Sequence, residues 1–339
     1  MNERPARYRR QLLRWNRLTL LTALLLILAG GIVRSSGSGM GCPDWPLCFG
    51  QWIPPLYETD LPANYQEIYS ERGYKDTRFN AFKTWTEYLN RLLGALTGFL
   101  VLVQAILALR YWRAGRSRAN PEFSIELSAS TGAKAALLWA GLALLLVLVQ
   151  GGIGAWVVAT HLKGSVVTLH LVLAWVLMTV QLWLGFALAP QPEQTCPYGQ
   201  LDRWGLSLWM LLLFGQLGLG ALVREAVDAW IPTYASDQFT FMALGEAYLW
   251  HKNLWMLILM LGAWLAYRQW TLYHDREAGF WAVSSMGMLT LQVISGLWMV
   301  LFGLPAVPRT LHILLGSLAL VSALGWWTRQ RMLLSKPKS

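Results

Sequence analysis

Two apolar segments that begin with the same triplet decide the predicted fold: TLHLVLAW, Thr168–Trp175, and TLHILLGS, Thr310–Ser317. A second pair of similar segments precedes them at the same spacing: QGGIGAWVV, Gln150–Val158, and QVISGLWMV, Gln292–Val300. Similarity between segments at a fixed offset is typical of a duplicated structural unit. The sequence therefore predicts two related halves, each with the same pair of consecutive helices.

A third pair extends this repeat toward the N-terminus. GGIVR, Gly30–Arg34, resembles GALVR, Gly220–Arg224, at a larger offset. A long connection after Arg34 accounts for most of the extra offset. We therefore predict two four-helix bundles in tandem that are pseudosymmetric. Because each bundle has an even number of helices, both have the same orientation in the membrane.

The composition is that of an integral membrane protein. Of 339 residues, 55% are hydrophobic and 14% are charged, whereas about 25% of the residues of a soluble domain are charged. The net charge of +10 therefore indicates membrane orientation, and no nucleic-acid partner is expected. We predict an all-α fold with membrane lipid as its surroundings. Its eight transmembrane helices are expected at 16–34, 84–110, 134–159, 164–188, 204–223, 246–268, 279–302 and 309–328.

Basic residues cluster at the N-terminus, in the connection after the second span and in the C-terminal tail. Cytoplasmic loops are enriched in Lys and Arg, so we predict a protein of the cell inner membrane with both termini in the cytoplasm. The predicted parts are a basic N-terminus at 1–15, a first bundle at 16–188 with an outer loop at 35–83, a cytoplasmic linker at 189–203, a second bundle at 204–328 and a basic tail at 329–339.

The outer loop contains two cysteines six positions apart, in GCPDWPLCFGQWI, Gly41–Ile53. Thiols outside the cytoplasm oxidise, so a disulfide between Cys42 and Cys48 is the favoured interpretation. A redox-active dithiol and two unpaired thiols remain alternatives, because spacing alone does not establish the geometry of a disulfide.

Three of the five histidines lie at one predicted depth in the membrane. His170, His251 and His312 each lie within about six residues of the start of an even-numbered span, or roughly 6–9 Å below the outer edge. The corresponding position of the second span is Asn90. A lone membrane histidine can simply hydrogen-bond a neighbouring helix. Two that face each other across a bundle are typical of haem ligation, whereas zinc needs further ligands.

Charged residues near the same outer helix ends are candidates for binding a haem. Arg34, Arg91, Arg224 and Arg309 can pair with haem propionates, or they can mark the membrane interface by snorkelling. Glu87 is a candidate for proton relay or catalysis, because it lies one helical turn before Asn90. The alternative role of Glu87 is an ion pair with Arg91 on the same helix face.

The stretch GGIVRSSGSGMGCPDWPLCFGQWIPP, the E-x-x-N-R of Glu87–Arg91 and the three histidines resemble the haem A synthase family. The resemblance covers nearly the whole chain. It implies eight helices in two bundles and the oxidation of a methyl group of haem O to a formyl group. It further implies a resident haem b on His251 and His312, and a substrate haem held by His170. A Cys42–Cys48 disulfide and a catalytic Glu87 are also implied.

The chain departs from the family at Asn90, where many members carry a histidine. The substrate iron is then expected to be five-coordinate through His170, since an amide oxygen is a weak ligand. The resemblance implies haem O synthase and an electron donor as partners. The alternative function is that of a di-haem electron-transfer protein of cytochrome b type. The difference between the two halves disfavours it, because a pure electron carrier benefits from two equal sites.

Overall fold

The computed structural model describes residues 4–116, 125–190, 198–230 and 245–334. Over these ranges all regular elements are helices, and there is no β-strand. The chain divides into two compact units, Met1–Ala189 and Pro190–Ser339. The predicted all-α fold is confirmed.

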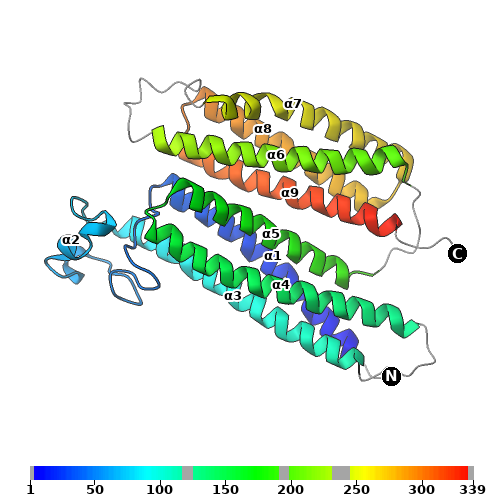
Figure 1. The fold of residues 1–339 in the computed structure, drawn as a ribbon, viewed down its shortest axis with the longest axis horizontal. Helices are drawn as coiled ribbons and strands as arrows, with labels where there is room; N and C mark the ends of the chain where they lie inside the picture. The colour runs from blue at the N-terminus through cyan, green and yellow to red at the C-terminus, as the bar shows by residue number, and fades with distance from the viewer. Residues whose placement is uncertain (1–3, 117–124, 191–197, 231–244, 335–339) are drawn as a thin grey trace. The chain divides into compact units, whose positions relative to one another are not determined.

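Four long helices build the described part of the N-terminal unit (Figure 1). They are α1 (Arg4–Ser35), α3 (Ala81–Arg116), α4 (Ile125–Ala159) and α5 (Gly164–Leu188). The connection between α1 and α3 contains α2 (Tyr65–Ile68) and two 3₁₀ turns, Glu58–Asp60 and Ser70–Arg72. Both α1 and α4 pack against α3 and α5. As a consequence, α3 and α5 lie at opposite corners of the bundle.

The C-terminal unit repeats this arrangement with four long helices in its described part (Figure 1). They are α6 (Gln200–Trp230), α7 (Gly245–Arg268), α8 (Arg276–Leu301) and α9 (Ala306–Leu334). A π-helical turn, Gln269–Tyr273, follows α7. Both α6 and α8 pack against α7 and α9, so α7 and α9 lie at opposite corners.

The outer faces of these helices carry large apolar side chains. Leu148, Leu211 and Leu301 are 67%, 68% and 75% exposed, and such side chains suit a lipid surface. Among the described residues, seven helices are long and apolar enough to cross a membrane. This supports a multi-pass membrane protein.

The prediction of eight spans differs from this finding at α7. The helix has 24 residues, which is long enough to span a bilayer. Its second turn, however, carries His251, Lys252 and Asn253 in succession, and these polar side chains lower its mean hydropathy. The same turn supplies one of the predicted site residues.

Polar side chains between helices fix the register of the N-terminal unit. Asn16 on α1 donates to the carbonyl oxygen and side-chain oxygen of Gln181 on α5, at 2.9 and 2.8 Å. Gln104 on α3 donates to the carbonyl oxygen of Trp15 on α1 at 3.1 Å. A buried polar group needs such a partner in an apolar surrounding. These bonds therefore fix α1 lengthwise against both of its neighbours.

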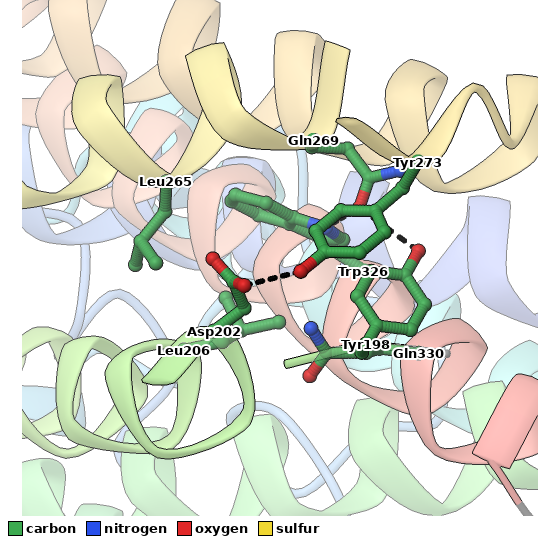
Figure 2. Close-up of a pocket in the computed structure, with 8 residues that line it drawn as sticks. All are labelled: Tyr198, Asp202, Leu206, Leu265, Gln269, Tyr273, Trp326 and Gln330. Atoms are coloured by element: carbon green, nitrogen blue, oxygen red, sulfur yellow. Dashed lines mark hydrogen bonds between the residues drawn. The ribbon is translucent and has the colours of Figure 1, made fainter. Parts of the chain in front are cut away.

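A polar cluster ties together α6, α9 and the π-helical turn of the C-terminal unit (Figure 2). Asp202 accepts hydrogen bonds from Arg268, at 2.5 and 2.9 Å, and from the hydroxyl of Tyr273. The side-chain oxygen of Gln269 accepts from the Tyr198 hydroxyl at 2.9 Å and from the indole of Trp326 at 3.2 Å. The π-helical turn aims both Gln269 and Tyr273 at this cluster.

Asp275 begins α8 and links it to α9. Its carboxylate accepts the backbone N–H of Ala278 at 2.7 Å and pairs with Arg329 at 3.0 Å. Burial raises the pKa of Asp275, but the hydrogen bonds from Arg329 and Ala278 outweigh it, so the pKa lies below its ordinary value. The ionised form therefore stabilises the fold above pH about 3.9, and this contribution is lost as the pH falls through the lowered pKa.

We predict that Asp275→Ala lowers the stability of the detergent-solubilised protein by about 1–2 kcal/mol, because it removes the helix cap and the ion pair. Asp275→Asn keeps a capping oxygen and is expected to lose less. Thermal unfolding at pH 7 measures both variants. The gap between wild type and Asp275→Asn should narrow below pH 4, and a gap independent of pH would contradict the ion pair.

Candidate functional site

Two imidazoles face each other inside the C-terminal unit. His251 lies in the second turn of α7 and His312 in the second turn of α9, on helices at opposite corners of the bundle. Their ring centroids are 6.2 Å apart, and the ring planes are inclined by 73°. The structure thus brings together the two histidines that the sequence paired.

Backbone carbonyl groups orient both rings through Nδ1. Nδ1 of His312 lies 3.0 Å from the carbonyl oxygen of Gln292 and 3.0 Å from the hydroxyl of Ser295. Nδ1 of His251 lies 3.2 Å from the carbonyl oxygen of Gln216, whose side chain donates back to the carbonyl oxygen of His251 at 2.8 Å. A carbonyl accepts only from a protonated Nδ1, so Nε2 of each ring is left free to bind a metal.

The spacing of the rings fits a metal bound between them. A metal–imidazole bond is about 2.0–2.1 Å long, so an ion held by two Nε2 atoms needs ring centroids about 6 Å apart. The glycines behind the rings leave them just enough room. A Cβ on Gly220 would lie 2.9 Å from Cε1 of His251, and one on Gly296 would lie 3.3 Å from Cε1 of His312.

The donor set suits a haem better than a bare metal ion. In the ranges that the structure describes, no three His, Cys, Asp or Glu side chains come together as a metal site. A zinc site is built from three or four protein ligands. A haem iron takes four nitrogens from its own porphyrin and needs one or two axial ligands. Two facing imidazoles supply these ligands without further protein groups.

The N-terminal unit has a related but unequal site. His170 lies in the second turn of α5, and Gln150 of α4 donates to its carbonyl oxygen at 3.0 Å. A Cβ on Gly154 would lie 3.7 Å from Cε1 of His170. Asn90 lies on α3, at the opposite corner. Nδ1 of His170 and Oδ1 of Asn90 are both buried without a hydrogen-bond partner.

The four predicted arginines fall into two groups. Arg34 lies in the last turn of α1, Arg309 in the first turn of α9, and Arg224 one turn beyond Gly220 on α6. Arg224 lies 3.9 Å from Asp228. Arg224 and Arg309 are therefore at the same end of the C-terminal unit as the histidine pair, where a propionate would need them.

Arg91 has a different environment, because it binds the outer loop. Its Nη1 donates to the carbonyl oxygens of Asp44 and Leu47 at 2.7 and 2.9 Å, and its Nη2 donates to that of Cys42 at 3.2 Å. Nε and Nη2 also donate to Oε1 of Glu87, at 3.1 and 2.5 Å. An arginine has five N–H donors, and all five have an acceptor here. In this geometry no donor of Arg91 remains for a propionate.

Glu87 completes this attachment of the loop. The side chain is 4% exposed, and its Oε2 accepts the backbone N–H of Cys42 at 2.8 Å. The structure therefore shows the ion pair with Arg91 that was the alternative to a catalytic role. Glu87 and Arg91 thus join α3, the helix that carries Asn90, to the outer loop.

The outer loop is held together by a disulfide and by aromatic packing. Cys42 and Cys48 form a disulfide with an S–S distance of 2.05 Å, which confirms the favoured interpretation. The ring of Phe49 packs edge-on against several aromatic rings: Tyr65, Tyr69, Tyr74 and Phe79. Burial and the nearby Glu87 carboxylate raise the pKa of the Tyr74 phenol, which stays protonated and donates to the carbonyl oxygen of Met40 at 2.9 Å.

Sequence reasoning missed the residues that orient the imidazoles. Gln216, Gln292 and Ser295 form these hydrogen bonds. The sequence carried a signal for one of these positions, though not for its carbonyl group: the repeated segments that led to the predicted bundles begin at Gln150 and Gln292. The loop carbonyls that bind Arg91 left no such signal, since backbone atoms carry no residue identity.

Helical spans, a loop stabilised by a disulfide and a cross-bundle pair of imidazoles together define a multi-pass membrane protein with a haem-type site. Residues 13–324 match the family described as cytochrome oxidase assembly protein, COX15-CtaA. The chain belongs to this family.

Several curated relatives are called Heme A synthase. The protein of Shewanella oneidensis is 29% identical over 205 residues, which cover 60% of this chain and 54% of that relative. The protein of Allorhizobium ampelinum is 28% identical over 233 residues, or 65% of this chain and 58% of the relative. This chain therefore spans little more than half of these two relatives. The protein of Rhodopseudomonas palustris is 27% identical over 332 residues, 87% of this chain and 83% of the relative.

We predict that Gly220→Ala displaces His251, because the added methyl group would lie 2.9 Å from Cε1 of the ring. Gly30→Ala is the matched control, since a Cβ on Gly30 meets no atom within 4 Å and alanine favours a helix by about 1 kcal/mol. Thermal unfolding of the haem-free protein in detergent should show a lower Tm for Gly220→Ala alone. An equal loss in both variants would contradict the tight packing at Gly220.

We predict that Arg91→Lys loosens the outer loop, because an ammonium group has three donors where the guanidinium has five. The disulfide Cys42–Cys48 should then be reduced faster by dithiothreitol, as measured by thiol labelling, with the helix content unchanged. Arg72→Lys, at an exposed position of the same loop, is the control. Reduction at the wild-type rate in Arg91→Lys would show that the loop is held by other contacts.

Proposed function

We propose that this protein is a haem A synthase, which oxidises a methyl group of haem O to a formyl group to give haem A for cytochrome oxidase. The observation that carries the proposal is the pair His251 and His312, with ring centroids 6.2 Å apart and both Nε2 atoms available. Membership of the cytochrome oxidase assembly family and the names of its relatives support the same activity.

The C-terminal unit binds the resident haem b in this proposal. His251 and His312 would hold its iron through Nε2, and Arg224 and Arg309 would neutralise its propionates. Haem b supplies one-electron redox chemistry when bound. The carbonyl oxygens of Gln216 and Gln292 hold the ring tautomers, which raises the basicity of both ligands. Polar residues in the outer turn of α7 then serve this haem, and α7 is the eighth transmembrane helix.

The N-terminal unit binds the substrate haem O. His170 ligates its iron, and Arg34, a basic residue in the last turn of α1, is assigned to one of its propionates. Arg91 serves this half indirectly, because its hydrogen bonds fix the outer loop on α3. The two units are tandem pseudosymmetric bundles in this proposal, since α3 and α5 lie at opposite corners of one unit as α7 and α9 do of the other.

Glu87 is the proposed catalytic group of this half. It lies one helical turn before Asn90 and therefore shares its face of α3. Both of its oxygens are hydrogen-bonded, one to Arg91 and one to the N–H of Cys42. A proton exchanged at Glu87 during oxidation of the methyl group removes the negative charge that strengthens these bonds. Its function is thereby coupled to the conformation of the disulfide loop.

The protein lies in the cell inner membrane with both termini in the cytoplasm, so the disulfide loop faces the oxidising side. Haem O synthase and an electron donor are its partners, because the reaction needs both substrate and electron transfer. A di-haem electron carrier of cytochrome b type is the alternative. It is disfavoured because the C-terminal unit carries the pair His251 and His312, while the N-terminal unit carries His170 and, on α3, Asn90.

The assignment of the two halves is tested by extracting pigment from membranes that contain haem O. His251→Ala and His312→Ala should lose haem b, while His274→Ala, at an exposed position between helices, should keep it. Glu87→Gln should retain haem b and form no hydroxylated or formyl haem. Loss of haem b from Glu87→Gln would contradict the assignment, and wild-type membranes with haem b but no oxidised haem would favour the electron carrier.

A further inference from the structure

Four glycines occupy equivalent positions behind the four candidate ligand sites. Gly220 and Gly296 lie against the rings of His251 and His312, and a Cβ on Gly154 would lie 3.7 Å from His170. Gly30, the repeat equivalent of Gly220, has no atom within 4 Å of its Cβ position. An imidazole therefore lies against three of these glycines, and no side chain lies against the fourth, Gly30.

The open position at Gly30 lies at the level of Asn90. Gln104 of α3 bonds to Trp15 of α1 at 3.1 Å and also to Thr19. The two helices are antiparallel. About four turns from this contact, toward the start of α3 and the end of α1, lie Asn90 on α3 and the region of Gly30 on α1. In the C-terminal unit the equivalent partners are His251 and Gly220, which are in contact.

Asn90 does not fill the space beside Gly30, because its side chain is shorter than that of histidine. Its Oδ1 is buried without a hydrogen-bond partner, and its amide also offers two N–H donors. A buried amide oxygen without a partner costs free energy unless a ligand satisfies it. The residue therefore has capacity for one polar group that enters the space beside Gly30.

We propose that the iron of the substrate haem is bound on one face by His170 alone, and that its other face, between Asn90 and Gly30, is an open site for a small exogenous ligand of diatomic or water size. Asn90 hydrogen-bonds this ligand and does not bind the iron. The inference rests on the proposed function, since it concerns the haem held by His170. It assigns the two halves different spin states: low-spin for the iron between His251 and His312, and high-spin for the other.

The test uses the full-length protein loaded with both haems in detergent. Electron paramagnetic resonance should show one low-spin and one high-spin ferric haem per chain. Carbon monoxide added to the reduced protein should bind one of the two haems. Asn90→His should convert the high-spin haem to low-spin and abolish carbon monoxide binding, because an imidazole fits against Gly30 as His251 fits against Gly220.

Asn90→Leu keeps the approximate size of Asn90 without its polar atoms, and it covers the case in which Asn90→His fails to fold. This variant should stay high-spin and bind carbon monoxide with a shifted C–O stretching frequency, since the hydrogen bond is lost. An unchanged frequency would overturn the role of Asn90. Two low-spin haems in the wild type would overturn the open site and leave the proposed function intact, whereas absence of the low-spin haem would refute the proposed function itself.

Discussion

The organisation of this protein depends on one constraint: two imidazoles must meet across a bundle inside an apolar membrane. His251 and His312 meet this constraint with ring centroids 6.2 Å apart, and each ring is oriented by a carbonyl oxygen of the preceding helix in the chain. Those carbonyls accept from histidine in addition to serving the helix. Glycines at the contact let the helices approach closely enough for this.

The two units have the same arrangement of helices, and they differ in the side chains at one corner. Each unit has the same cyclic order of helices. In each unit, residues in the second turns of the two helices at opposite corners can therefore lie at the same depth. The C-terminal unit fills both corners with histidine. The N-terminal unit has Asn90 at one corner, and the adjacent Glu87 and Arg91 bind a disulfide loop instead. The two units therefore share an arrangement of helices but differ in the side chains at one of the two corners.

Much of this arrangement could be predicted from the sequence. In a bundle of transmembrane helices, the depth of a residue follows from its distance along the chain from the start of its helix. The repeated segments placed His170 and His312, and the count of residues from each helix start placed His251 at the same level. The attachment of Arg91 to the loop could not be predicted, since its partners are mainly backbone carbonyls. The predicted span at α7 is not among the seven helices that are apolar enough to cross a membrane, because polar residues fill its second turn. The sequence is thus least informative where side chains bind backbone or serve the cofactor.

The central claim is that the imidazoles of α7 and α9 bind one iron between them. A structure of the haem-loaded protein with anomalous scattering recorded at the iron edge tests it most directly. The account predicts an iron peak between Nε2 of His251 and Nε2 of His312, about 2 Å from each. An iron peak elsewhere in the C-terminal unit, or rings turned toward lipid with no peak between them, would contradict it.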